Sequence, residues 1–207
     1  MHHQITPFLD AAFPAHGDTI PLDHGYALLG ALSRVLPELH EAKRWGVHPV
    51  LGERRSPGVL ALTKRSTIKL RIPSENAGRI MPLAQQTIDL QGKRVRLGVP
   101  RLWPLNPAPQ LRARLVTIKK FHEEPEAFLL ALRRQLAQIP NLGQDPERIE
   151  VQLGPRRILR ASIHKVVGWA VALTGLEAGA SLAVQCAGLG GRRHMGAGIF
   201  VPPRRGA

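Results

Sequence analysis

Residues 68–72 read Ile68-Lys69-Leu70-Arg71-Ile72, an alternation of apolar and basic side chains. Because successive side chains of a strand point to opposite faces, this pattern predicts a strand with one buried face and one basic face. We expect the strand to span residues 59–72, and the elements that flank it decide the fold.

The segments on both sides of this strand complete a recognisable order of elements. Leu29, Leu32 and Leu36 recur at helical spacing, and Pro37 should end or kink that helix near Leu36. The expected elements are a strand at 5–13, a helix at 22–36, a strand at 47–51, the strand at 59–72, a helix at 75–86 and a strand at 94–99. The first half of the chain therefore predicts a β-α-β-β-α-β unit.

The second half repeats this order of elements without repeating the sequence. Pro104, Pro107 and Pro109 form a stiff connector between the halves. The elements expected after it are a strand at 111–118, a helix at 125–138, strand and hairpin segments at 149–153 and 158–173, a helix at 178–187 and a strand at 199–201. The sequence thus predicts an α+β fold of tandem ferredoxin-like (RRM-like) units, one at residues 1–106 and one at 107–207.

Positive charge dominates the composition. The 29 Lys and Arg residues exceed the 15 Asp and Glu residues, for a net charge of +14. From residue 151 onward the only acid is Glu177, so the charge is segregated. A compact chain with such an excess is favoured by a polyanionic partner, and nucleic acid is the commonest one. A basic protein without such a partner is the competing interpretation.

Other features of the composition exclude several classes of protein. Cys186 is the only cysteine, which rules out an internal disulfide and a cysteine zinc site and is typical of a cytoplasmic protein. No apolar stretch is long enough to span a membrane, and the N-terminus does not resemble a signal peptide. The acids are few and scattered, so we expect neither a metal site nor a cofactor.

A glycine-rich segment near the C-terminus is the sharpest motif. Residues 188–200 read Gly-Leu-Gly-Gly-Arg-Arg-His-Met-Gly-Ala-Gly-Ile-Phe. Glycines allow close approach of the backbone to a ligand, and successive N–H groups can form a concave anion site. Arg192 and Arg193 could clamp phosphates there. A glycine-rich connection with solvated arginines is the alternative.

The same segment carries a resemblance to a known family. Gly188-Leu189-Gly190, five residues, then Gly196-Ala197-Gly198 resembles the C-terminal glycine-rich loop of the CRISPR repeat-processing endoribonucleases, the Cas6 family. Residues 21–26, which open the first helix, and Leu39-His40-Glu41, which follows it, are also similar to that family. The Myxococcus-type subgroup is the most similar, and the resemblance spans nearly the whole chain.

The resemblance implies tandem RRM-like folds and an endoribonuclease that cleaves CRISPR precursor RNA within each repeat, without a metal. The 2′-hydroxyl would attack the phosphate, leaving a 2′,3′-cyclic phosphate and a 5′-hydroxyl. The implied partner is a CRISPR repeat RNA hairpin, and membership of a CRISPR interference complex stays open.

The reaction requires a base for the 2′-hydroxyl, and histidine suits this role because it ordinarily titrates near neutrality. His40 is the first candidate because Leu39-His40-Glu41 matches the family position of the general base. His48 is the candidate partner acid, and His24 is a weaker alternative. An exposed histidine without a catalytic role is the competing interpretation of His40.

Two further features bear on catalysis. Lys43, together with Arg44, could neutralise the charge on the scissile phosphate. Some relatives carry a catalytic tyrosine in the first helix, and the matching position here is Ser33, so either Ser33 replaces it or another group takes the role.

The candidate RNA-binding residues belong to the second unit. Aromatic residues make up 4% of the chain, and no RRM-type aromatic pair is visible, so phosphate contacts and hairpin shape should dominate recognition over base stacking. The candidates lie on the expected hairpin and the glycine-rich segment: Arg156, Arg157, Arg160, Lys165, Gly188, Gly190, Gly191, Arg192, Arg193, Gly196 and Gly198.

Two other functions share many of these features. A non-catalytic protein that holds an RNA hairpin in a ribonucleoprotein would need the same charge, fold and glycine-rich segment. An enzyme acting on a small phosphorylated metabolite could use the glycine-rich segment, but a net charge of +14 exceeds what so small a ligand needs.

Overall fold

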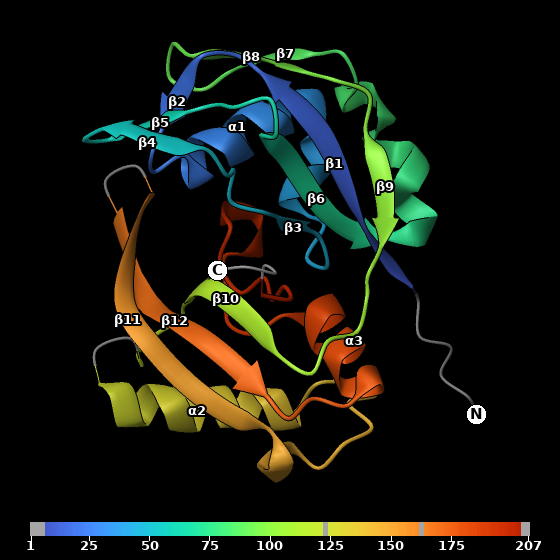
Figure 1. Cartoon of the computed structure of the whole chain (residues 1–207), viewed down its shortest axis with the longest axis vertical. Coiled ribbons are helices and arrows are strands. Elements are labelled where there is room, and N and C mark those ends of the chain that lie inside the picture. The colour runs from blue at the N-terminus through green and yellow to red at the C-terminus, as the bar shows by residue number, and fades with distance from the viewer. Residues whose placement is uncertain (1–6, 122–123, 162–163, 204–207) are drawn as a thin grey trace. The chain divides into compact units, whose positions relative to one another are not determined.

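The computed structural model describes residues 7–121, 124–161 and 164–203 (Figure 1). Two compact units make up this part of the chain. Residues 7–104, together with residues 160, 161 and 164, form the N-terminal unit, and residues 105–121, 124–159 and 165–203 form the C-terminal unit.

The N-terminal unit combines one α-helix with several short strands and two 3₁₀ helices. In chain order its elements are β1 (Phe8–His16), β2 (Thr19–Pro21), α1 (Gly25–Val35), η1 (Pro37–His40), β3 (Gly46–Val47), β4 (Glu53–Ser56), β5 (Val59–Ala61), β6 (Thr67–Pro73), η2 (Ser74–Leu83), β7 (Thr87–Asp89), β8 (Arg94–Leu97) and β9 (Arg101–Pro104).

The main sheet of this unit has the strand order β3-β6-β1-β8-β7, and β9 also pairs with β1. Strands β6, β1 and β9 run side by side in Figure 1. With β1, β3, β6 and β8 taken as the four strands of a β-α-β-β-α-β unit, the first strand lies between the third and the fourth. This is the ferredoxin-like arrangement, with α1 and η2 as its two helical segments.

The alternation in residues 68–72 confirms a strand with one face in the core. Ile68, Leu70 and Ile72 are at most 1% exposed, and Ile68 and Leu70 pair with Phe13 and Ala11 of β1, which are fully buried. The other face differs from the prediction of an exposed basic surface, because Arg71 is also buried, at 1% exposed.

Two expected elements of this unit take a different form. The strand expected at 59–72 is interrupted between β5 and β6 by a turn, in which Ser66 accepts a hydrogen bond from the Thr63 amide (2.9 Å). The helix expected at 75–86 is the 3₁₀ helix η2, which contains Pro82. Proline has no N–H to donate within a helix, and the shorter-range 3₁₀ pattern tolerates such interruptions in short pieces.

The C-terminal unit follows the predicted element order more closely. Its elements are β10 (Leu111–Val116), α2 (Pro125–Ala137), η3 (Pro146–Arg148), β11 (Glu150–Ala161), β12 (His164–Thr174), α3 (Ala178–Ala187) and η4 (Arg193–Met195).

The sheet of the C-terminal unit has the order β10-β12-β11. The strand expected at 199–201 is reduced to a bridge between Val201 and Arg112 of β10, closed by backbone hydrogen bonds in both directions (2.8 and 3.0 Å). This bridge gives the C-terminal unit the same order as the N-terminal unit. The prediction of an α+β fold of tandem ferredoxin-like units is confirmed.

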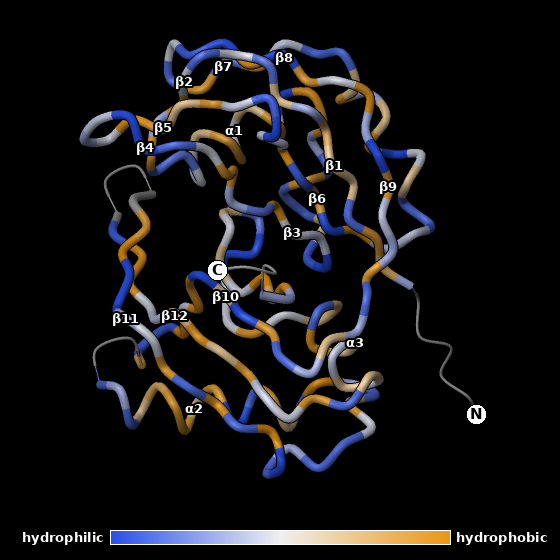
Figure 2. Tube along the Cα trace, in the orientation of Figure 1, coloured by the Kyte–Doolittle hydropathy of each residue, from blue (hydrophilic) through white to orange (hydrophobic). Residues whose placement is uncertain are grey.

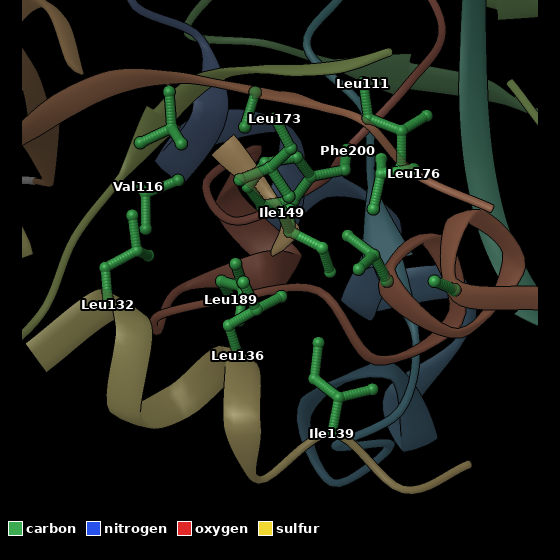
Figure 3. Packing of buried hydrophobic residues seen from close by; sticks show 14 of the residues in the cluster. Leu111, Val116, Leu132, Leu136, Ile139, Ile149, Leu173, Leu176, Leu189 and Phe200 are labelled. Atoms are coloured by element: carbon green, nitrogen blue, oxygen red, sulfur yellow. The ribbon is translucent and has the colours of Figure 1, made fainter. Parts of the chain in front are cut away.

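Helices α2 and α3 pack onto the sheet through one apolar core. Phe128, Leu132 and Leu136 of α2 are fully buried, and hydrophobic and hydrophilic segments alternate along this helix in Figure 2. Figure 3 shows Leu132 and Leu136 near Val116 and Leu189. Leu189 and Phe200, which bracket most of the glycine-rich segment, both belong to this core. Among the described residues, the helices are too short or too polar to cross a bilayer.

Candidate functional site

His40 lies at the end of η1 and is exposed to solvent. Pro37 starts this 3₁₀ helix directly after α1, and Leu39, which is fully buried, fixes it to the core. Hydrogen-bonded turns then lead to Trp45, which is 3% exposed. Two buried anchors therefore flank a short exposed segment, and His40 is presented on it.

Positive side chains accompany His40 on this segment. Lys43 and Arg44 are both exposed. The Arg44 guanidinium lies 5.0 Å from the centroid of the Phe8 ring, within the range of a cation–π contact. Glu38, in the same 3₁₀ helix as His40, pairs with Arg79 of η2 at 3.3 Å. The segment thus combines an imidazole, which can act as a general base, with two cations, which can stabilise negative charge on a phosphate.

His48 has a different environment. Its side chain is buried, and its Nε2–H donates to Asp10 Oδ1 at 3.2 Å. Burial lowers the pKa of His48 to about 4, although the neighbouring Asp10 carboxylate has the opposite effect and raises it. A histidine that is neutral and committed to a buried carboxylate is poorly suited to donate a proton to a leaving group at neutral pH. This geometry favours a structural role for His48 over the role of partner acid.

Asp10 is the centre of this buried polar cluster. Arg71 donates to both of its carboxylate oxygens, from Nε at 2.8 Å and from Nη2 at 3.0 Å. Burial alone would raise the pKa of Asp10, but the hydrogen bonds and positive charges of His48 and Arg71 outweigh this effect and hold the pKa below its usual range. The cluster joins β1, β6 and the segment after β3.

The pKa of His48 predicts how stability depends on pH. Between about pH 4 and 6.5 the unfolded chain binds a proton at His48 that the folded chain does not, so stability rises with pH across this window. At pH 5 the expected cost is about 2 kcal/mol relative to pH 8. His48→Gln should flatten this part of the profile, as measured by urea unfolding at several pH values. Profiles of equal slope for the two proteins would contradict the assignment.

His24 and Ser33 are also held inside the N-terminal unit. The Val50 amide donates to His24 Nε2 at 2.9 Å, and His24 Nδ1–H donates to the Pro21 carbonyl at 3.0 Å. His24 is 3% exposed, and Ser33 is 8% exposed. The hydroxyl of Ser33 is buried without a hydrogen-bond partner among the described residues. Neither side chain is presented to a ligand as His40 is.

In the C-terminal unit, the glycine-rich segment folds tightly onto its own sheet. Gly188 and Gly190 have positive φ angles, of 66° and 76°. A Cβ at Gly188 would collide with the carbonyl oxygen of Gly198, and one at Gly190 would lie 2.5 Å from the carbonyl oxygen of Thr117. The glycines at these positions are therefore required by close backbone packing.

The backbone amides of this segment are largely used within the protein. The Gly190 amide donates to Gln135 Oε1 at 2.7 Å, the Gly191 amide to the Thr117 carbonyl at 2.9 Å and the Gly198 amide to the Leu115 carbonyl at 2.8 Å. Amides that already donate internally are not available to an anion. The geometry therefore favours a structural role for most of the segment over the expected anion site.

The two arginines of the segment have separate roles. The Arg193 guanidinium turns back to α3, and Nη1 donates to the carbonyls of Cys186 and Ala187. Those carbonyls end the helix, so Arg193 acts as a C-terminal cap. Arg192 is exposed in a left-handed conformation (φ 64°) at the tip of the segment. Arg192 is thus the member of the pair that a phosphate could reach.

The hairpin candidates lie on β11 and β12, as expected. Arg156, Arg157 and Lys165 are exposed. Arg160 lies in β11, but its side chain is outside the described part of the structure. The alternation of strand side chains places Arg156 and Arg157 on opposite faces of the hairpin.

Comparisons with known proteins identify the family. A family profile described as Cas6 Crispr matches residues 9–205. The chain is 44% identical to the CRISPR-associated endonuclease Cas6 of Myxococcus xanthus (strain DK1622) over 200 residues, or 97% of this chain and 84% of that protein. The chain belongs to the Cas6 family. The resemblance found in the sequence, including its Myxococcus-type character, is confirmed.

Solved Cas6 structures share the fold at low sequence identity. A Cas6-related protein from Pyrococcus furiosus aligns with a TM-score of 0.66 and 14% identity, over 94% of this chain and 97% of that one. A CRISPR endoribonuclease bound to a 19-nucleotide RNA aligns with a TM-score of 0.51 and 14% identity, over 94% and 98%. These alignments support the tandem ferredoxin-like fold of this Cas6 family member.

The Asp10 cluster of this Cas6 chain was not predicted from its sequence. Asp10 is the only acid between residues 1 and 17, and it lies in a segment otherwise rich in apolar residues. A single charge in such a strand is a signal of a buried ion pair, but its partner depends on strand pairing. No group of three or more potential metal ligands is present among the described residues.

Proposed function

We propose that this chain is a metal-independent endoribonuclease that cleaves CRISPR precursor RNA within its repeats to make guide RNAs. The observation that carries the proposal is the exposed His40, held beside Lys43 and Arg44 in a member of the Cas6 family. The printed name of the relative from Myxococcus xanthus, an endonuclease, supports the class of reaction.

In the proposed reaction His40 removes the proton from a ribose 2′-hydroxyl. The resulting oxygen attacks the adjacent phosphorus, the bond from phosphorus to the 5′-oxygen of the next nucleotide breaks, and that 5′-oxygen takes up a proton from water. The products are a 2′,3′-cyclic phosphate and a 5′-hydroxyl. Lys43, with Arg44, stabilises the negative charge that accumulates on the phosphate oxygens. His48 supports the strand that carries Asp10 and takes no part in proton transfer.

The two units are proposed to divide the work. The N-terminal unit, within residues 1–106, supplies the catalytic histidine, and the C-terminal unit, within residues 107–207, holds the repeat hairpin. The exposed cations of the second unit, Arg156, Arg157, Lys165 and Arg192, would contact phosphates, together with Arg160. The single cysteine and an RNA substrate fit a cytoplasmic protein, which could pass its product to a CRISPR interference complex.

The test is cleavage of a labelled CRISPR repeat RNA in the presence of EDTA. The same RNA with a 2′-deoxy sugar at the cut site is the matched control. The proposal requires that the first RNA is cut and that the second is bound but intact. Cleavage that EDTA abolishes, or that persists on the 2′-deoxy RNA, would contradict the mechanism. Binding of both RNAs without cleavage of either would leave a protein that only holds the hairpin.

A further inference from the structure

Trp103 is an exposed tryptophan on a sheet of the N-terminal unit. It lies in β9, every residue of which is exposed, and its own exposed fraction is 55%. The other two tryptophans differ, because Trp45 is 3% exposed and Trp169 packs against the ring of Phe128. More than half of this aromatic side chain is therefore open to a stacking partner.

Strand register fixes the face on which Trp103 lies. Trp103 pairs with Asp10 of β1, and Asp10 pairs with Arg71 of β6. Residues directly opposite each other on neighbouring strands project to the same face. Trp103 therefore lies on the face that carries the Asp10 cluster, opposite the face formed by Leu70 and Ala11, and it borders the buried part of that face.

Two cations, Arg101 and Lys69, lie on the same face near Trp103. Arg101 precedes it by two residues, which places the two side chains on one face roughly 7 Å apart along the strand. Arg101 pairs with Ala12, and Ala12 pairs with Lys69, whose side chain is 35% exposed.

The acids of this face do not balance these cations. Asp10 accepts a hydrogen bond from Arg71 and lies 3.8 Å from Lys69 Nζ, so its single negative charge is set against the three positive charges of Arg71, Lys69 and Arg101. The surface around Trp103 is therefore cationic.

We propose that Trp103 is a stacking platform for an unpaired base of the RNA, with Arg101 and Lys69 contacting the flanking phosphates. A base has a π-face that stacks on an indole ring, and its backbone carries the negative charge that these side chains complement. The inference rests on RNA being the substrate of the proposed reaction. It adds a site for single-stranded nucleotides in the N-terminal unit, apart from the hairpin-binding candidates of the C-terminal unit.

A single-stranded probe isolates this contact from hairpin recognition. The probe is a fluorescein-labelled oligoadenylate of about ten nucleotides, within the usual site size of single-strand binding folds. An abasic strand of the same length keeps the phosphates and lacks the bases. Trp103→Ala should weaken binding of the oligoadenylate by roughly 5- to 100-fold and change binding of the abasic strand by less than about 2-fold. Trp103→Phe should restore most of the affinity.

Leu102→Ala is the matched control, because Leu102 is a similarly exposed residue of β9 (47%) that projects to the opposite face. It should bind both probes as the wild type does. Equal effects of Trp103→Ala on the two strands, or no effect on either, would overturn the inference. Cleavage of saturating repeat RNA by Trp103→Ala tests the two proposals separately. Weaker binding of the oligoadenylate with normal cleavage supports both proposals. Normal binding of the oligoadenylate with normal cleavage refutes only the proposal that Trp103 is a stacking platform.

Discussion

Replacing His40 with alanine is expected to lower the single-turnover rate of repeat cleavage by about 10²- to 10⁴-fold, the usual contribution of a general base. The side chain is exposed and makes no packing contribution to the core, whereas its neighbour Leu39 is fully buried and fixes η1. The loss should therefore appear in the chemical step. The Kd for uncleavable 2′-deoxy repeat RNA should stay within about 2-fold of the wild-type value.

His16→Ala provides the matched control. His16 is also an exposed histidine of the N-terminal unit, at the end of β1, and it lies outside the η1 segment. Its replacement should leave the cleavage rate unchanged. A His40→Ala protein that cuts at the wild-type rate would refute the assignment of the base. A parallel loss of cleavage in both variants would indicate a general effect of removing a surface histidine.

A Lys43→Ala variant separates charge stabilisation from proton transfer within the same segment. The catalytic proposal gives Lys43 a weaker effect than His40 because the exposed Arg44 carries the same charge at the next position. The order of the two effects therefore reports which side chain is closest to the reacting atoms.

The sequence predicted the parts of the fold that depend on local periodicity. The helix expected at 178–187 has the observed bounds of α3, and the helix expected at 125–138 is one residue longer than α2. Ile68, Leu70 and Ile72 face the core as their alternation indicated. Local patterns determine these elements because each buries one face of its own.

Features that depend on strand pairing were not predictable in the same way. Arg71 looked like a member of an exposed basic face, and it is buried because β1 brings Asp10 opposite to it. The strand expected at 199–201 is only a bridge, and the glycine-rich segment before it is held instead by the Gly191 and Gly198 amides, which donate to the carbonyls of Thr117 and Leu115.

The sequence predicted which residues are candidates for the site, but it did not predict how buried each of them is or what each contacts. Three histidines of the first unit matched the chemistry equally well as residue types. Burial distinguishes them, because His24 and His48 are enclosed and hydrogen-bonded while His40 is exposed. Similarly, Arg192 and Arg193 are adjacent in sequence, and only the helix end at Ala187 shows that Arg193 is a cap. Residue type suggests a function, and the tertiary contacts decide which of several residues of that type is able to perform it.

Replacing Asp10 with alanine is expected to reduce the free energy of unfolding by about 3–5 kcal/mol, the usual cost of breaking a buried ion pair from one side. The Arg71 side chain is 1% exposed and would keep its charge without the carboxylate that now accepts two of its hydrogen bonds. His48 would lose its acceptor at the same time. Urea unfolding at neutral pH measures the change.

Two further variants decide whether this loss comes from the buried charge. Asp10→Asn keeps an oxygen that can accept from Arg71 Nε but removes the negative charge, so its loss of stability should fall between the wild type and Asp10→Ala. Asp18→Ala, at an exposed aspartate of the same unit, should stay within about 0.5 kcal/mol of the wild type. An Asp10→Ala protein as stable as Asp18→Ala would mean that the carboxylate does not hold β1 and β6 together, and His48 would then lose its structural assignment as well.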